Sequence, residues 1–358
     1  MHFPYTGPPF THPTLPYRAH YVGNTTPRSN PSHYLASIQA LVQVYHMDIQ
    51  YTFEETISDS DLYQVSNATE TNDSRIQTFV PLVVNTQGWI KGLGGDLLRK
   101  IEELVEATDI FEMELPANAK LRQRSEPTAT RIHTLQPILK SLLTAYYTAA
   151  DHRALSILSY FHCLFPPHGS QADKWTTHLP LCARPPWEVD CPGGIDRIIL
   201  VGAGYEDVVP QELDRAINCG IVALVCDEDP IGGYSALNPE DSTNSLPYSQ
   251  GLSVPSPSTS YCVGLGLIRG VDTANHILHV LTPLPSSMVS RCRVLVKGEL
   301  ELPVWGMLDF RDANGVAGNK WGNVPYLQMG GGGIGAIGAG RKRVRKNLMR
   351  RGQIPVLP

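Results

Sequence analysis

The chain has 358 residues, enough for two domains of ordinary size, and its hydrophobic fraction of 42% can supply two cores. No stretch approaches the roughly 20 uninterrupted apolar residues of a membrane span, and the N-terminal sequence lacks the apolar core of a signal peptide. We therefore expect an intracellular protein without a membrane segment. The seven cysteines form no CxxC pair and are odd in number, which predicts neither a disulfide framework nor a zinc site.

The net charge of −5 conceals an uneven distribution. Asp312 is the last acidic residue, and eight Lys and Arg residues follow it, so residues 1–312 carry −13. Such a basic tail suits nucleic acid, a nuclear or nucleolar address, or an acidic partner. The alternative is a solvated terminus without a partner.

The first segment, to about residue 165, alternates helix-like and strand-like patterns. Asn30 and Pro31 suit an N-cap and a first helical position, and apolar residues then recur at helical spacing as far as Tyr45. This pattern predicts an amphipathic helix. Residues 51–78 are acidic and polar and predict a short, partly ordered insertion.

A strand, loop, helix and strand then follow in order. The apolar run FVPLVV (79–84) is typical of a buried strand, DLLRKIEELVEA (96–107) of a helix, and DIFEMEL (109–115) of a second strand. This βαβ order predicts a parallel sheet with its functional loops at the carboxyl ends of the strands.

Beyond this segment the composition changes. Residues 166–194 are crowded with Pro, Gly and Trp, as a domain junction would be. Residues 195–328 contain several strand-like runs separated by turn residues, among them two apolar runs on either side of the turn GVDTAN (270–275), which predicts a β-rich, antiparallel second domain. Residues 329–358 form a Gly-rich lead and the basic tail.

Two loops suit RNA contacts. In NTQGWIKGLG (85–94), Trp89 could stack on a nucleobase and Lys91 could meet a phosphate, although a core position for Trp89 is the alternative. In GNTTPRSNPSHY (23–34), Thr26 and Asn30 bracket a proline turn at the mouth of a helix, where side-chain and backbone donors can hold phosphate. The alternative there is only a capped helix.

Arg153 is a further candidate, on the helix around DHRALSILSYFHCLF. An Arg that donates to a transferring phosphoryl group stabilises the charge of the transition state, whereas a surface ion pair is the alternative.

Two glycine loops are rejected as nucleotide sites. GAIGAGRK (335–342) has Walker A glycine spacing but Arg341 and Lys342 at the Lys and Ser/Thr positions, and no buried strand precedes it. GAGYED (202–207) has Asp207 where a dinucleotide fingerprint needs glycine.

Five segments together resemble the polynucleotide 5′-hydroxyl kinases, specifically the branch that processes pre-ribosomal RNA in the fungal nucleolus. They are GPPFTHP (7–13), YRAHYVGNTTPRSNPSHY (17–34), PLVVNTQGWIKGLGGDLL (81–98), LSYFH (158–162) and VKGELELPVWGML (296–308).

The resemblance implies a fold and a set of sites. The fold is α/β: part of a P-loop NTPase-like kinase domain over residues 1–165 and a smaller β-rich domain over 195–328. By position, Thr26 and Asn30 match the family's clasp over the RNA end, Trp89 matches its base-stacking tryptophan, and Arg153 falls in the region of its arginine-bearing lid.

The resemblance also implies an activity and partners. The family transfers the γ-phosphate of ATP, with Mg²⁺, to an RNA 5′-hydroxyl, and its member associates with an endonuclease that cleaves the second internal transcribed spacer. The family's Walker A loop and acidic magnesium motif should lie upstream of GPPFTHP, and these 358 residues contain neither. We therefore expect this chain alone neither to bind ATP tightly nor to phosphorylate RNA.

Two functions remain open on the sequence. The chain is either a shortened copy of an active kinase or a non-catalytic module that binds RNA or the nuclease. An in-frame GxxxxGK[ST] just upstream of Met1 in the genome would favour the first.

Overall fold

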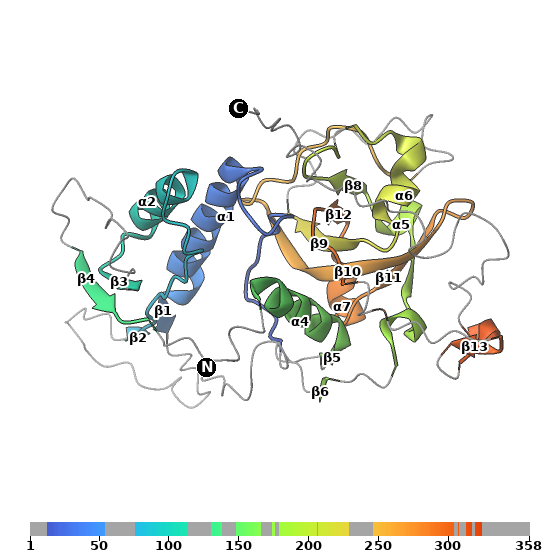
Figure 1. The fold of residues 1–358 in the computed structure, drawn as a ribbon, viewed down its shortest axis with the longest axis horizontal. Helices are drawn as coiled ribbons and strands as arrows, with labels where there is room; N and C mark the ends of the chain where they lie inside the picture. Colours follow the sequence, from blue (N-terminus) through green and yellow to red (C-terminus); the bar gives the residue numbers. More distant parts are fainter. Residues whose placement is uncertain are drawn as a thin grey trace, which may run out of the picture.

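The computed structural model describes residues 13–53, 76–113, 130–137, 148–165, 174–175, 179–205, 207–228, 246–303, 307, 313–316 and 319–323. These residues form two lobes side by side (Figure 1). No helix among them is both long enough and apolar enough to cross a membrane.

The first lobe begins with the predicted amphipathic helix. Helix α1 spans Pro31–Val44, with Asn30 as its N-cap, and a π-helical turn, η1 (Tyr45–Ile49), extends it. The prediction for this helix is confirmed. Strand β1 (Tyr51–Phe53) then pairs antiparallel with β2 (Ile76–Phe79). The polar insertion between these strands lies outside the described residues.

The predicted buried strand at 79–84 is wrong. Only Phe79 belongs to a strand, and β2 pairs with β1 rather than with a parallel neighbour. Residues 81–88 are exposed, with Val83 87% exposed. The composition of an apolar run favours burial, but burial in a sheet also requires neighbouring strands, which the run itself does not determine. The described residues of this lobe provide none at this place.

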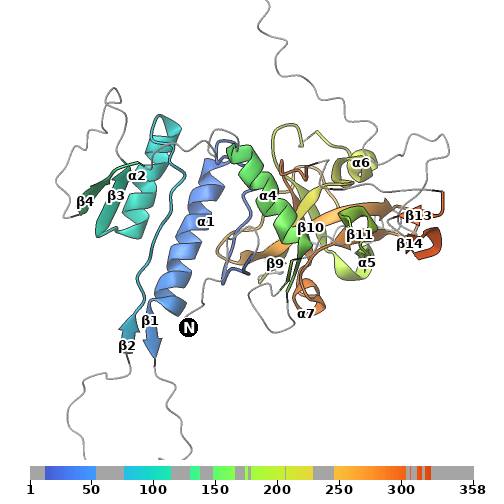
Figure 2. The same ribbon diagram turned by 60° about the horizontal axis from the view of Figure 1, so that its bottom comes forward.

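Helix α2 spans Leu93–Val105 and confirms the predicted helix. Its buried side, which includes Leu97 and Ile101, faces α1, and the two helices lie side by side in both views (Figures 1 and 2). Strand β3 (Asp109–Met113) follows and pairs parallel with β4 (Arg131–Leu135). A parallel pair therefore exists, but β4 provides it instead of residues 79–84. We call α1, η1, α2 and β1–β4 the N-terminal lobe.

The second lobe is built on a six-stranded sheet in the order β7-β11-β10-β9-β12-β8. The strands are β7 (Trp187–Asp190), β8 (Arg197–Leu200), β9 (Ile221–Asp227), β10 (Ser260–Asp272), β11 (Ile277–Leu281) and β12 (Val294–Lys297). Four of the five neighbouring pairs are antiparallel, as predicted, but β8 and β12 are parallel, so the sheet is mixed. The predicted hairpin around GVDTAN is confirmed as β10–β11.

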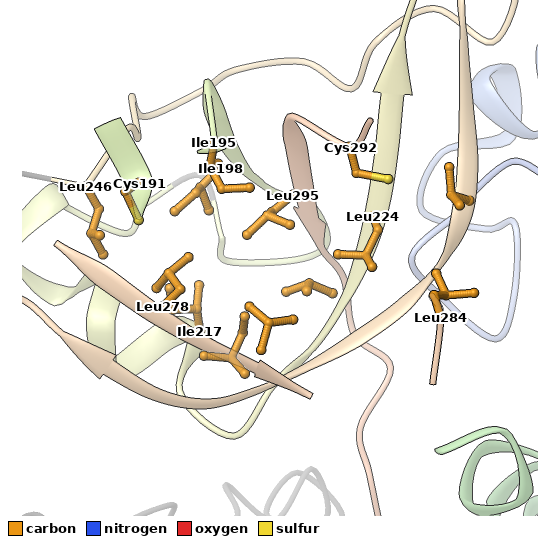
Figure 3. Packing of buried hydrophobic residues seen from close by; sticks show 14 of the residues in the cluster. Cys191, Ile195, Ile198, Ile217, Leu224, Leu246, Leu278, Leu284, Cys292 and Leu295 are labelled. Atoms are coloured by element: carbon orange, nitrogen blue, oxygen red, sulfur yellow. The ribbon is translucent and has the colours of Figure 1, made fainter. Parts of the chain in front are cut away.

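The sheet curls because its two edges are neighbours in the sequence. The edge strands β7 and β8 are joined only by α5 (Cys191–Gly194) and two further residues. So short a connection cannot span a flat six-stranded sheet, whose strands lie about 4.8 Å apart. The curled strands enclose a core, in which Leu224, Leu278 and Leu295 point toward one another (Figure 3).

Helix α4 (Ala149–His162) packs against this sheet, although it precedes the Pro-rich stretch of the chain. Phe161 is 1% exposed and shares a cluster with Leu267 and Leu281. The Tyr160 hydroxyl donates to the Leu265 carbonyl (3.2 Å) and accepts from the Leu265 N–H (2.8 Å). We call α4 and the six-stranded sheet, with the segments between them, the C-terminal lobe.

Shorter elements complete the description. They are β5 (Cys163–Leu164), β6 (Lys174–Trp175), η2 (Leu181–Ala183), η3 (Pro210–Glu212), α6 (Leu213–Ile217), α7 (Ser286–Val289), β13 (Gly315–Val316), β14 (Asn319–Lys320) and η5 (Trp321–Asn323).

Candidate RNA-binding site

The turn at residues 24–30 leads into α1 and carries the first two predicted site residues. The Asn30 Oδ1 accepts from the His33 N–H (3.1 Å), and the Thr26 N–H donates to the Asn24 Oδ1 (3.2 Å). Thr26 is half-buried and Asn30 is exposed. Asn30 is therefore the predicted helix cap, and its amide group remains accessible from solvent. We call residues 24–30 the clasp turn.

The loop at residues 88–92 leads into α2 and carries the next two. Gly88 and Gly92 have positive φ angles of 68° and 55°, which favour glycine. Gly92 caps α2 without a side chain, so its first turn has no side-chain partner from the cap. Lys91 is exposed beside this helix end. Because an exposed cation lies at the N-terminal end of a helix, the loop favours an anion.

The Trp89 ring is neither buried in a core nor fully exposed to solvent. It is half-buried, and its ring lies against the α2 backbone: a Cβ on Gly94 would lie 2.2 Å from the ring atoms Cγ and Cδ2. The buried-core alternative is therefore not what the structure shows. Part of the ring is held against the helix, and part remains accessible.

Arg28 joins the two loops. Its guanidinium carbon lies 5.1 Å from the centroid of the Trp89 ring, within cation–π range. Thr26, Asn30 and Trp89 thus come together at the N-terminal ends of α1 and α2. Sequence reasoning did not single out Arg28, although an exposed Arg between Thr26 and Asn30 was a visible signal.

Arg153 lies elsewhere. It is exposed in the second turn of α4, whose opposite side packs on the C-terminal sheet. The helix begins with a capping box, in which the Thr148 hydroxyl and N–H donate to Asp151 and hold the pKa of that carboxyl below its usual value. Among the described residues, no hydrogen bond or ion pair connects Arg153 to the clasp turn or to Trp89.

An apolar groove of about 290 Å³ runs between the two helices and the exposed 82–86 segment. Its lining is mostly aliphatic, so it does not itself suit phosphate. The lining residues are Tyr34, Ile38, Leu41, Val42, Leu82, Val83, Val84, Asn85, Thr86, Ile101 and Val105.

Among the described residues of the site, no loop has the Walker A pattern that holds ATP phosphates. In the part of the chain that the structure describes, no three His, Cys, Asp or Glu side chains are grouped to hold a metal ion. The rejected loop GAIGAGRK lies outside that part. The residues present do not fit these two groups, and we derive no chemical step through either.

Comparison with known proteins identifies relatives of this arrangement. Residues 60–163 match the family model described as mRNA cleavage and polyadenylation factor CLP1 P-loop, and residues 250–303 match the NOL9-like C-terminal domain. The two matches confirm the predicted fold class, a P-loop-like α/β region followed by a smaller domain that is rich in β-strands.

Three curated relatives are each named a polynucleotide 5′-hydroxyl-kinase. The chain is 36% identical to polynucleotide 5′-hydroxyl-kinase GRC3 of Cryptococcus neoformans (strain B-3501A), over 98% of this chain and 49% of that protein. It is 27% identical to grc3 of Schizosaccharomyces pombe, over 97% and 47%, and 25% identical to NOL9 of Arabidopsis thaliana, over 83% and 69%. The chain spans about half the length of the fungal relatives. It is therefore a homologue of the polynucleotide 5′-hydroxyl kinases, with similarity over nearly all of its own length and about half of theirs.

Proposed function

We propose that this chain carries the RNA-binding part of a polynucleotide 5′-hydroxyl kinase, an enzyme that transfers the ATP γ-phosphate to the 5′-hydroxyl of RNA. The observation that carries the proposal is the contact between Arg28 and Trp89, which places two predicted RNA loops side by side. Similarity to kinases of this name over 98% of the chain supports it.

Each residue of the site has a distinct role in this proposal. Backbone phosphates near the RNA end are held by the N-terminal ends of α1 and α2, at Asn30 and Gly92. The Thr26 hydroxyl and the Lys91 ammonium group contribute two further contacts to these phosphates. Trp89 stacks on a base, which needs the exposed Arg28 side chain to move aside. Arg28 can then pair with a phosphate, so the movement exchanges one favourable contact for another.

Phosphoryl transfer needs a loop that these residues do not provide. The P-loop Lys and Mg²⁺ supply most of the charge stabilisation in such enzymes, and the 358 residues contain no Walker A sequence. In this proposal, ATP and Mg²⁺ would bind outside the residues that form this site. Arg153 would act in the lid only after moving toward the RNA end. This chain alone phosphorylates no RNA.

The cellular role that we propose is processing of pre-ribosomal RNA at the second internal transcribed spacer, in the nucleolus. The RNA end would be supplied by an endonuclease partner whose cleavage leaves a 5′-hydroxyl. The basic residues between Arg341 and Arg351 support a nucleic-acid-rich compartment, because they favour anionic partners.

The test measures binding of the chain to a single-stranded RNA with a 5′-hydroxyl end by fluorescence anisotropy. Trp89→Ala should weaken binding by roughly 1–3 kcal/mol, the range for loss of one base–aromatic stack. Trp187→Ala is the matched control, since Trp187 is 47% exposed on β7, in the other lobe. Equal affinity of wild type and Trp89→Ala would contradict the stacking role.

A kinase assay separates the enzyme from the binding module. The 358-residue chain with ATP, Mg²⁺ and this RNA should give no phosphorylated product, and the same chain joined to the part of a relative that it does not match should give product. Product from the short chain would refute our assignment of the phosphate loop. A complete lack of product from the longer protein, with RNA binding intact, would favour the non-catalytic module.

A further inference from the structure

The segment before the clasp turn is bound to the C-terminal sheet. The Ala19 carbonyl accepts from the Cys262 N–H (2.8 Å), which adds this segment to the edge of a bulge in β10. Tyr21 is 9% exposed and packs in a cluster with Val225 and Val296 on that sheet. The chain therefore reaches the clasp turn from the C-terminal lobe, not from the N-terminal lobe.

A contact between two glycines fixes the point where the clasp turn begins. Gly23 has φ +78°, and its carbonyl accepts from the Glu299 N–H at 2.6 Å. A Cβ on Gly298 would lie 2.2 Å from the Gly23 carbonyl oxygen and 2.4 Å from its Cα. Both neighbours are backbone atoms and cannot rotate away. Only glycine at position 298 allows this approach.

The glycine loop that resembles a nucleotide fingerprint supports the other side of this contact. The Ala203 N–H donates to the Glu299 Oε1 (3.2 Å), and the Val201 N–H donates to the Lys297 carbonyl (2.8 Å). A Cβ on Gly202 would lie 2.9 Å from the Glu299 Cγ. The loop at 202–204 therefore holds Glu299 in place.

The residues that follow the clasp turn contact the segment that precedes it. The His33 Nε2, in the first turn of α1, lies 3.2 Å from the Tyr21 carbonyl oxygen, in hydrogen-bond range. From these contacts we infer that Gly298 and Glu299 of the C-terminal lobe are positioning residues for the clasp turn. Gly298 and Glu299 determine the positions of Thr26 and Asn30 but do not themselves contact RNA. This inference rests on the proposed function for its RNA readout but not for its structural one.

The first experiment needs no RNA. Hydrogen exchange of the full chain is compared between wild type and Gly298→Ala at a temperature where both are folded by circular dichroism. We expect faster exchange in residues 22–33, because the clasp turn loses its anchor. Gly266→Ala is the matched control: its Cβ would lie 2.8 Å from Val280, which strains the core of the same lobe without touching Gly23 or the contact between Ala19 and Cys262. Unchanged exchange at 22–33 in Gly298→Ala would overturn the inference.

The second experiment measures affinity for the 5′-hydroxyl RNA. Gly298→Ala should bind about tenfold more weakly, since small displacements of positioned groups are costly, and Gly266→Ala should bind like wild type. Glu299→Ala should also weaken binding, whereas Glu299→Gln should restore it, because an amide oxygen can still accept from the Ala203 N–H. Equal losses of affinity for Gly298→Ala and Gly266→Ala would overturn a specific positioning role.

The two experiments distinguish the two proposals. If Gly298→Ala exchanges faster at 22–33 but the wild type binds no RNA, the positioning of the clasp turn is supported and the RNA site is refuted. If RNA affinity falls in Trp89→Ala but does not change when Gly298 or Glu299 is substituted, the RNA site is supported and the positioning role is refuted.

Discussion

The two lobes bury their apolar residues to very different degrees. In the C-terminal lobe, Ile198, Val296 and Leu278 are fully buried. In the N-terminal lobe, Phe111, Met113 and Ile132 of the parallel β3–β4 pair are 49–65% exposed. Parallel strands in known folds are covered on both faces. The contrast teaches that the C-terminal lobe contains its own core, while the N-terminal lobe presents surfaces suited to further contacts.

The largest expected effect tests where α4 belongs. Phe161→Ala should lower the free energy of unfolding by about 3–5 kcal/mol, because a fully buried ring leaves a cavity against β10 and β11. Urea unfolding followed by circular dichroism measures it. Leu155→Ala, on the same helix at 37% exposed, is the control and should cost much less. Similar losses for both would mean that α4 is not part of the C-terminal core.

A polar contact sharpens the same assignment. Tyr160→Phe removes the group that accepts from the Leu265 N–H, beside the bulge in β10. A buried donor without a partner costs about 1–3 kcal/mol, and we expect a loss of unfolding free energy in that range. Urea unfolding is again the measurement. A loss below about 0.5 kcal/mol would indicate that water reaches this amide and that the helix is not closely packed there.

Sequence reasoning succeeded where the pattern is local. The Asn30 cap and the periodic apolar residues of α1 define a helix without reference to the rest of the chain. The same holds for the β10–β11 hairpin, whose turn residues lie between two apolar runs.

It failed where partners decide the structure. The run at 79–84 was expected to be buried because of its composition, yet burial depends on strands from elsewhere. The close approach of Gly23 to Gly298 also depends on residues far apart in sequence, and no local pattern predicts it. In the candidate site, the loops were predictable but the Arg28 contact that joins them was not.

A pH test addresses the boundary between the lobes. His20 lies beside Arg18 and a pocket that also contains Asp48 of the N-terminal lobe. Burial, and then the nearby Arg18 and His33, lower the pKa of His20 to about 4 from 6.5. A folded pKa below the unfolded one makes stability complete above pH 6.5 and progressively smaller as the pH falls toward 4.

The expected loss is on the order of 1 kcal/mol, because partial exposure of the ring screens the effect. Urea midpoints at pH 7 and pH 5 measure it, and His20→Gln should flatten the difference between them. If the variant keeps the wild-type pH dependence, another group titrates and the ring is not held neutral at this boundary.

The last prediction compares the same substitution in the two lobes, and its effect at Val83 is the smallest that we expect. Val→Thr replaces a methyl group with a hydroxyl at nearly constant volume, so its cost reports the environment of the side chain. Val83→Thr, in the exposed 82–86 segment, should change the unfolding free energy by less than about 0.5 kcal/mol. Val296→Thr, fully buried in β12, should cost about 1–3 kcal/mol. Equal costs would mean that Val83 is covered in solution, and a cost that rises with protein concentration would identify a second copy of the chain as the cover.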